Sequence, residues 1–127
     1  MSYDLYFWRE ECPLGKTPNE ISGMLTDDAT VAGVATFPRS TVRQRFRDAF
    51  PTIVDNDIGM DWEGAGSYFQ VGFNHSDGKN VNCIIVTCGY QLIQSQDTMN
   101  LIIGVVNSLG CALYDPQTGQ RYQQPEG

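Results

Sequence analysis

The segment 55–63 holds the densest group of side chains in this chain that could do chemistry. Four carboxylates are spread along it: Asp55, Asp57, Asp61 and Glu63. Alternating carboxylates are typical of calcium loops, but an EF-hand loop that begins at Asp55 needs glycine at its sixth position and glutamate at its twelfth. Met60 and Gly66 occupy those two positions. The sequence therefore predicts no metal site here and favours a solvated, exposed loop that serves as a contact surface.

A catalytic centre has little support in the sequence. His75 is the only histidine, and a nucleophilic triad would need a hydroxyl or thiol beside it and a carboxylate that orients it. His75 falls in a predicted turn, and turns lie at the surface. The Gly-x-x-x-x-Gly-Lys, Gly-x-Gly-x-x-Gly, Gly-x-Ser-x-Gly and His-Glu-x-x-His motifs are all missing. We therefore expect no catalytic residue and no cofactor, hence a protein that is not an enzyme.

The cysteines indicate a reducing compartment. Cys12, Cys83, Cys88 and Cys111 are widely spaced and form no Cys-x-x-Cys pair, which argues against a zinc knuckle or a thioredoxin-type redox site. Cys83 and Cys88 lie in one apolar run, and a strand would place them on opposite faces. We expect the cysteines to be free thiols that behave as small buried hydrophobic residues.

The charge of the chain limits its partners. Eight basic residues against fifteen acidic ones give a formal net charge of −7 and a pI near 4.4. Nucleic acid and anionic membranes are bound through cationic surface, so neither is an expected partner, whereas a basic protein would be attracted. The alternative is that acidity only keeps the protein soluble. Arg43, Arg45 and Arg47 form the one basic cluster, which we interpret as a solvated helix face.

The sequence also predicts where the protein resides. Its first residues lack the basic and apolar regions of a secretory signal, and no apolar run approaches the roughly 20 residues that a membrane-spanning helix needs. We therefore expect a cytoplasmic protein.

Periodicity and capping signals predict the secondary structure. Strands are expected over 2–9, 68–73 and 81–88, the last two as a hairpin, with two short arms within 111–122 around a tight turn at 115–119. Three helices are expected. The first begins at Thr17, whose capping box includes Glu20; the second covers 40–50; the third runs from an N-cap at Asp97 to Gly110. Residues 52–66 are expected to form an exposed loop.

These elements predict a single α+β domain over 1–127, ordered over about 1–122, with a frayed tail at 123–127. The expected fold class is a two-layer sandwich, a mainly antiparallel sheet with helices on one face, in the ferredoxin-like order β-α-α-β-β-α-β.

The two ends of the chain carry a family resemblance. Residues 1–9, Met-Ser-Tyr-Asp-Leu-Tyr-Phe-Trp-Arg, and residues 111–122, Cys-Ala-Leu-Tyr-Asp-Pro-Gln-Thr-Gly-Gln-Arg-Tyr, look like those of small bacterial cytosolic proteins. Some of these resemble immunity proteins of contact-dependent growth inhibition and other polymorphic toxin systems. The resemblance covers about a fifth of the chain and concerns framework residues. It implies a protein that binds the C-terminal domain of a cognate toxin and blocks its active site.

Such a toxin is often a nuclease with a basic substrate groove, which an acidic inhibitor can occupy. The expected partner contacts are Asp55, Asp57, Asp61 and Glu63 with Trp62 as an aromatic anchor, and, as a second choice, Asp27 and Asp28. The alternative for these residues is that Trp62 packs on its own core while the acids solvate a loop.

Two other functions stay open. One is a small cytosolic enzyme or ligand-binding domain with a pocket between sheet and helices. The other is a housekeeping relative of immunity proteins that has no toxin. We expect a monomer or a weak homodimer.

Overall fold

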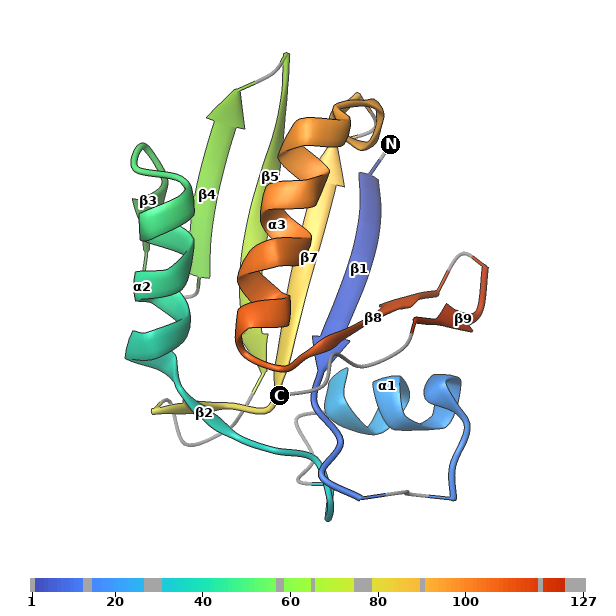
Figure 1. Ribbon diagram of the computed structural model, residues 1–127. Coiled ribbons are helices and arrows are strands. Elements are labelled where there is room, and N and C mark those ends of the chain that lie inside the picture. The colour runs from blue at the N-terminus through green and yellow to red at the C-terminus, as the bar shows by residue number, and fades with distance from the viewer. Residues whose placement is uncertain are drawn as a thin grey trace.

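The computed structural model describes residues 2–12, 15–26, 31–56, 59–64, 66–74, 79–89, 91–116 and 118–122. Within them the chain builds an open seven-stranded antiparallel sheet and a separate two-stranded one (Figure 1). The large sheet has the order β3-β4-β5-β7-β1-β8-β9, and β2 pairs with β6. The elements are β1 (Ser2–Trp8), α1 (Pro18–Thr26), β2 (Phe37–Pro38), α2 (Arg39–Ala49), β3 (Val54–Asp55), β4 (Gly59–Gly64), β5 (Ser67–Asn74), β6 (Asn80–Val81), β7 (Cys83–Gly89), a 3-10 turn η1 (Leu92–Gln94), α3 (Gln96–Ser108), β8 (Ala112–Asp115) and β9 (Gln120–Arg121).

The centre of the sheet is as the sequence predicts, except that the strand expected over 81–88 begins at Cys83 as β7, while Val81 belongs to β6 and pairs with Phe37 of β2. β5 and β7 pair antiparallel, and β1 lies on the other side of β7, so the apolar run of β7 is interior. β8 pairs with the outer edge of β1. The α+β class and the ferredoxin-like order of these four strands, β5-β7-β1-β8, are confirmed.

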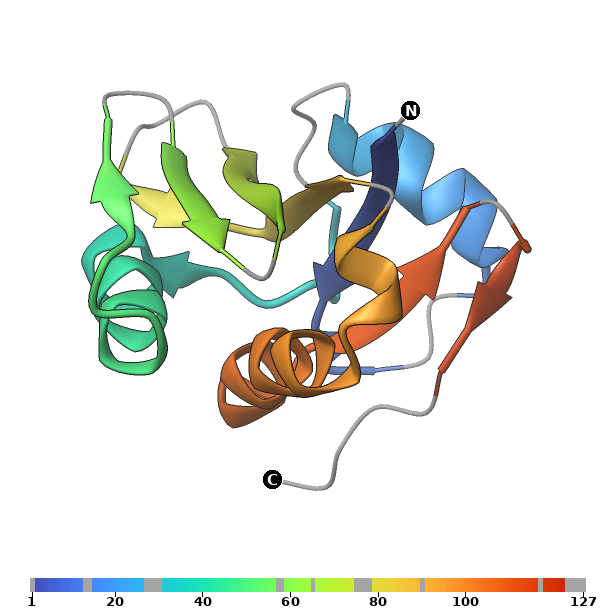
Figure 2. The same cartoon turned by 90° about the horizontal axis from the view of Figure 1, so that it is seen from above.

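The placement of the helices differs from the prediction in one respect. Helices α2 and α3 pack side by side on one face, where Phe46, Ile102 and Val106 join the larger core with Leu5 and Phe7. Helix α1 packs on the opposite face instead, where it forms a second, smaller core with β1 and β8 (Figure 2). The expectation that all helices share one face is therefore wrong for α1.

The smaller core explains why α1 crosses to the other side. Ile21 and Leu25 of α1 are buried against Trp8 and Tyr114, which point away from the larger core on β1 and β8. The aromatic residues of β1 alternate between the two faces, as period-two strand geometry requires. The strand therefore needs apolar cover on both sides, and α1 supplies it on the second.

Local signals at the helix ends are mostly confirmed. The Thr17 hydroxyl accepts the Glu20 backbone N–H at 3.2 Å, and Glu20 Oε1 accepts the Thr17 backbone N–H at 3.3 Å, which is the predicted capping box. Gly110 follows α3 with φ of 78°, a left-handed conformation that favours glycine. The N-cap of α3 is Ser95, and Asp97 lies inside the first turn, so the predicted cap at Asp97 is wrong.

The segment 52–66 is not the loop that the sequence predicts. It contains β3 and the six-residue β4, which pairs with β5 along its whole length. Met60 is buried, and Trp62 packs in part on the larger core. The apolar residues 60 and 62 point inward and the acidic residues 61 and 63 point outward, which is strand periodicity that the flanking glycines obscured.

The two ends of the described chain lie together. β1 lies next to β8, and β8 next to β9. The Tyr3 hydroxyl donates to Asp115 Oδ2 at 2.8 Å, while the Arg121 guanidinium lies 4.4 Å from the Trp8 ring centroid and pairs with Glu10. These contacts join the beginning and end of the described chain.

Candidate functional site

The side of β4, β5 and β7 that faces away from α2 and α3, together with Asp4 on β1, carries the best candidate site. We call it the uncovered face, because α1 covers the β1 and β8 side of the sheet and no described helix lies over β4 and β5 (Figure 2). Glu63, Tyr68 and Gln70 are exposed there, and Ile85 is half-buried. This face is therefore accessible to another molecule.

A row of polar side chains crosses the uncovered face from strand to strand. The register places Asp61 opposite Gln70, Gln70 opposite Thr87, and Thr87 opposite Asp4. The Thr87 hydroxyl donates to Asp4 Oδ1 at 2.9 Å. Neighbouring strands lie about 4.8 Å apart, so the row presents polar groups at nearly regular intervals. We call these four residues the polar row.

The uncovered face is acidic, and its own strands carry no basic residue that would offset the negative charge. Asp4, Asp61 and Glu63 lie on it, whereas none of the eight lysines and arginines falls on β1, β4, β5 or β7. Four of those basic residues are on α2, which packs on the opposite side of the sheet. The fold therefore gives this part of the molecule a local excess of negative charge, which attracts cationic groups.

A depression of about 270 Å³ opens on the same face. Its lining includes Asn56, Asp61, Gln70, Gly72, Ile85 and Thr87. Gly72 has no side chain to fill the space above its strand, and a Cβ atom built there would meet only Ile85 atoms at 3.8 Å or more. The glycine therefore leaves the floor of the depression open.

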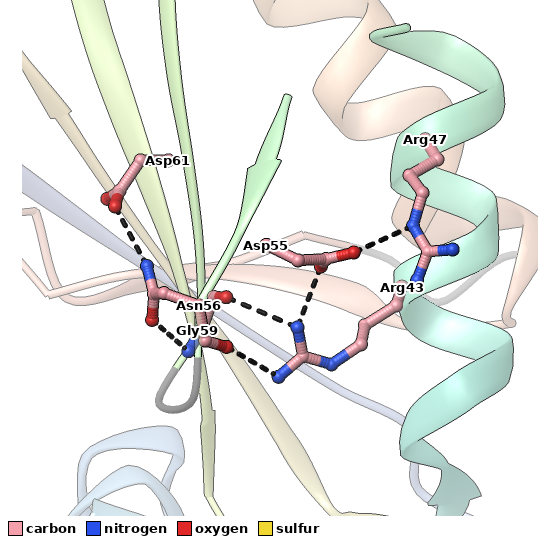
Figure 3. A network of polar contacts seen from close by, with 6 residues as sticks. All are labelled: Arg43, Arg47, Asp55, Asn56, Gly59 and Asp61. Atoms are coloured by element: carbon pink, nitrogen blue, oxygen red, sulfur yellow. Dashed lines mark hydrogen bonds and ion pairs between the residues drawn. The ribbon is translucent and has the colours of Figure 1, made fainter. Parts of the chain in front are cut away.

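A polar network behind the depression fixes the β3–β4 connection (Figure 3). Arg43 Nη1 lies 2.7 Å from Asp55 Oδ1, and Arg43 Nη2 donates to the Asn56 carbonyl at 3.1 Å. Arg47 Nε pairs with the second Asp55 oxygen at 2.9 Å. The Asn56 side chain in turn donates to Asp61 Oδ2 at 2.8 Å and accepts the Gly59 backbone N–H. Helix α2 thus positions Asp61 through Asn56.

Arg43 is therefore a structural residue, and the prediction of a merely solvated arginine face is wrong for it. Its side chain is only 15% exposed and lies over the ring of Phe73. Arg45 is exposed and, among the described residues, donates one hydrogen bond, to Ser108. The two neighbouring arginines of one helix thus differ sharply in their contacts.

We expect Arg43→Ala to lower the free energy of unfolding by about 1–3 kcal/mol, because it removes charge-assisted hydrogen bonds and a ring contact. Arg45→Ala, a matched control with the same change of charge, should cost less than about 0.5 kcal/mol. Urea unfolding of both variants measures the difference. Equal losses would contradict the structural role of Arg43.

The predicted partner contacts separate into different environments. Asp61 and Glu63 lie on the uncovered face, but both oxygens of Asp55 are already paired with arginines of α2. Trp62 points to the opposite side, where its ring centroid lies 5.2 Å from that of Phe69 and 5.3 Å from that of Phe50. Trp62 therefore packs on the protein's own core. Asp57, Asp27 and Asp28 lie outside the described residues, as does His75.

Several residues of the candidate site were missed from the sequence. Asp4, Gln70 and Thr87 reach it through strand register, and Asn56 reaches it through its hydrogen bond to Asp61. Of the two local signals that could have found part of the site, one was the alternation of residues 59–64. A polar residue within an otherwise apolar strand, such as Thr87, was the other.

The alternative function predicts a pocket between the sheet and the helices. The described residues between the sheet and α2 and α3 are apolar and closely packed, with Phe46, Phe69 and Ile102 fully buried. The depression over Gly72 lies on the other side of the sheet. The described structure therefore does not favour this alternative.

The cysteines offer no reactive thiolate inside the protein. Cys83, Cys88 and Cys111 are buried free thiols, and burial raises the pKa of each to about 12. Cys83 and Cys88 belong to opposite cores, as the strand prediction requires. Cys12 is exposed, so the expectation that it is buried is wrong.

The described residues contain no cluster of three or more potential metal ligands.

Among the described residues, no helix is long and apolar enough to cross a membrane. Comparison with known proteins adds no further constraint: no family model, no curated protein and no solved structure matches this chain.

Proposed function

We propose that this chain is an immunity protein of the cytoplasm, which binds a cognate toxin C-terminal domain through its uncovered face and blocks the active site of that domain. The observation that carries the proposal is the uncovered face itself, where Asp4, Asp61 and Glu63 lie on strands that contain no lysine or arginine. The resemblance of the two chain ends to immunity proteins supports the class of partner.

Electrostatics supports a basic partner, such as a nuclease. A nuclease groove is cationic because it binds phosphates, and the carboxylates of an inhibitor can take the place of those phosphates. The net charge of −7 would accelerate encounter with such a groove. The polar row would then supply short-range contacts at positions that the sheet holds fixed.

The proposed interface differs from the one predicted from the sequence. It keeps Asp61 and Glu63 and adds Asp4, Gln70 and Thr87. It leaves out Asp55, which α2 neutralises, and Trp62, which packs on the core. Hydrogen bonds from Asn56 to Asp61 and from Thr87 to Asp4 already hold three of these side chains, which lowers the entropy cost of ordering them on binding.

The test uses the toxin domain encoded immediately beside the gene for this chain. Co-expression should restore the growth of cells that produce this toxin domain, and the affinity of the purified pair should fall as ionic strength rises, because screening weakens exposed charge pairs. The absence of a neighbouring toxin gene would favour the housekeeping relative without a toxin. Growth inhibition that this chain leaves unchanged would contradict the proposal.

A further inference from the structure

The depression over Gly72 is large enough to take one side chain and is small for a ligand pocket. Its volume is about 270 Å³, while pockets for small ligands usually enclose about 300–1,000 Å³ and bury most of the ligand. The depression also lies at the centre of the uncovered face, between β4 and β7. A protruding side chain of a docked protein could enter it without a change in the sheet.

The walls of the depression combine an apolar surface with hydrogen-bond acceptors. Gly72 and Ile85 form the apolar part, on which an aliphatic stem can lie. Asp61 uses Oδ2 to accept from Asn56, and its Oδ1 has no hydrogen-bond partner among the described residues. Gln70 is exposed and has an amide oxygen, while Thr87 has a hydroxyl that can accept as well as donate. The acceptors therefore come from three adjacent strands.

We infer that the depression is an anchor site for an arginine side chain of the partner protein. The inference rests on the proposed function, since it names the group that the uncovered face would capture. The guanidinium lies against Asp61 Oδ1 and the acceptors of Gln70 and Thr87, and the methylene stem covers Gly72 and Ile85.

Arginine fits this arrangement better than lysine does. The acceptors are spread across three strands, and a guanidinium presents five N–H donors in a planar fork, whereas an ammonium is a compact and strongly hydrated point charge. Arginine is also enriched among the residues that dominate binding energy at protein interfaces. One buried arginine would thus fix the position of the partner protein on the uncovered face.

The test uses three short peptides as probes: acetyl-Gly-Arg-Gly-amide, the same peptide with lysine, and the same peptide with citrulline, the uncharged analogue of arginine. Each is titrated into the ¹⁵N-labelled full chain while amide chemical shifts are recorded. We expect the arginine peptide to shift the amides of Gln70, Gly72 and Thr87, the lysine peptide to bind several-fold more weakly, and the citrulline peptide to cause no shift. Equal binding of lysine, or arginine-induced shifts only elsewhere, would overturn the inference.

Two variants locate the site. Gly72→Val fills the depression and should abolish the shifts, whereas Gly104→Val adds the same atoms on α3, where a Cβ atom has nothing within 4 Å, and should leave them unchanged. Asp61→Asn removes the charge but keeps an acceptor for Asn56, and should weaken binding at least several-fold. Normal binding by Gly72→Val would also overturn the inference.

The inference and the proposed function can fail separately. If the neighbouring toxin domain is neutralised but the arginine peptide leaves these amides unshifted, the anchor site is wrong and the function stands. If the peptide binds and no toxin domain is neutralised, the function is wrong and the site remains.

Discussion

At about pH 10.5 the protein is expected to be several kcal/mol less stable against unfolding than at about pH 8. The cause is the burial of Cys83, Cys88 and Cys111, which raises the pKa of each thiol from 9.0 to about 12. The thiols ionise in the unfolded chain above 9.0 but stay neutral in the folded protein. Their contribution to stability is therefore complete below 9.0 and is lost as the pH rises toward 12.

The expected loss is large compared with ordinary protein stability. One pKa unit corresponds to about 1.36 kcal/mol, so each thiol loses about 2 kcal/mol at about pH 10.5 and the three together lose about 6 kcal/mol. Domains of this size are stable by about 5–15 kcal/mol. Burial and hydrogen bonding also raise the pKa of Tyr6 and Tyr3, and both act in the same direction.

Urea unfolding at several pH values under reducing conditions measures this effect. A variant with Cys83, Cys88 and Cys111 changed to alanine is the control: it should be less stable at neutral pH because of lost packing, yet its stability should decline less between about pH 9 and about pH 10.5. A wild-type curve that stays flat over this range would contradict the burial of neutral thiols.

The parts of the fold that the sequence predicts are those with strong local signals. The Thr17–Glu20 capping box and Gly110 after α3 depend on neighbouring residues only. The pairing of β5 with β7 joins two strands that lie close together in the chain. β4 was missed because glycines at 59 and 64 are typical of loops, although Met60 and Trp62 alternate with Asp61 and Glu63 as strand residues do. A pairing partner in β5 outweighs the poor strand propensity of the glycines.

The candidate site was only partly predictable, because it depends on register between distant segments. Asp4 and Thr87 are 83 positions apart, yet their side chains are hydrogen-bonded. The sequence marks Asp61 and Glu63 as acidic, but it does not reveal that Asp55 is neutralised by Arg43 and Arg47 from a helix. The face on which α1 packs is likewise set by tertiary contacts, so the open side of the sheet could not be foreseen.

The second large effect concerns the affinity for the toxin domain. Asp4→Asn, Asp61→Asn and Glu63→Gln together remove the charge of the uncovered face and keep side-chain shape and hydrogen-bond acceptors. Close charge pairs at an acidic inhibitor interface couple by about 1.5–7 kcal/mol, a range the barnase and barstar complex provides. We therefore expect the triple variant to bind the toxin domain at least about 100-fold more weakly, which corresponds to about 2.7 kcal/mol.

A second triple variant removes the same number of charges elsewhere. Glu11→Gln, Asp48→Asn and Asp97→Asn alter exposed residues outside β1, β4, β5 and β7. Each variant changes the formal net charge from −7 to −4, so long-range attraction to a basic partner is reduced alike in both. A difference in affinity between the two triple variants is therefore due to where the charges lie on the protein.

The affinity of the neighbouring toxin domain for these two variants, measured by calorimetry at one ionic strength, is the most direct test of the uncovered face as the binding surface. We predict a loss of at least about 100-fold for the variant of the uncovered face and a loss within about threefold for its equal-charge counterpart. Equal affinities of the two variants would place the interface elsewhere on the molecule.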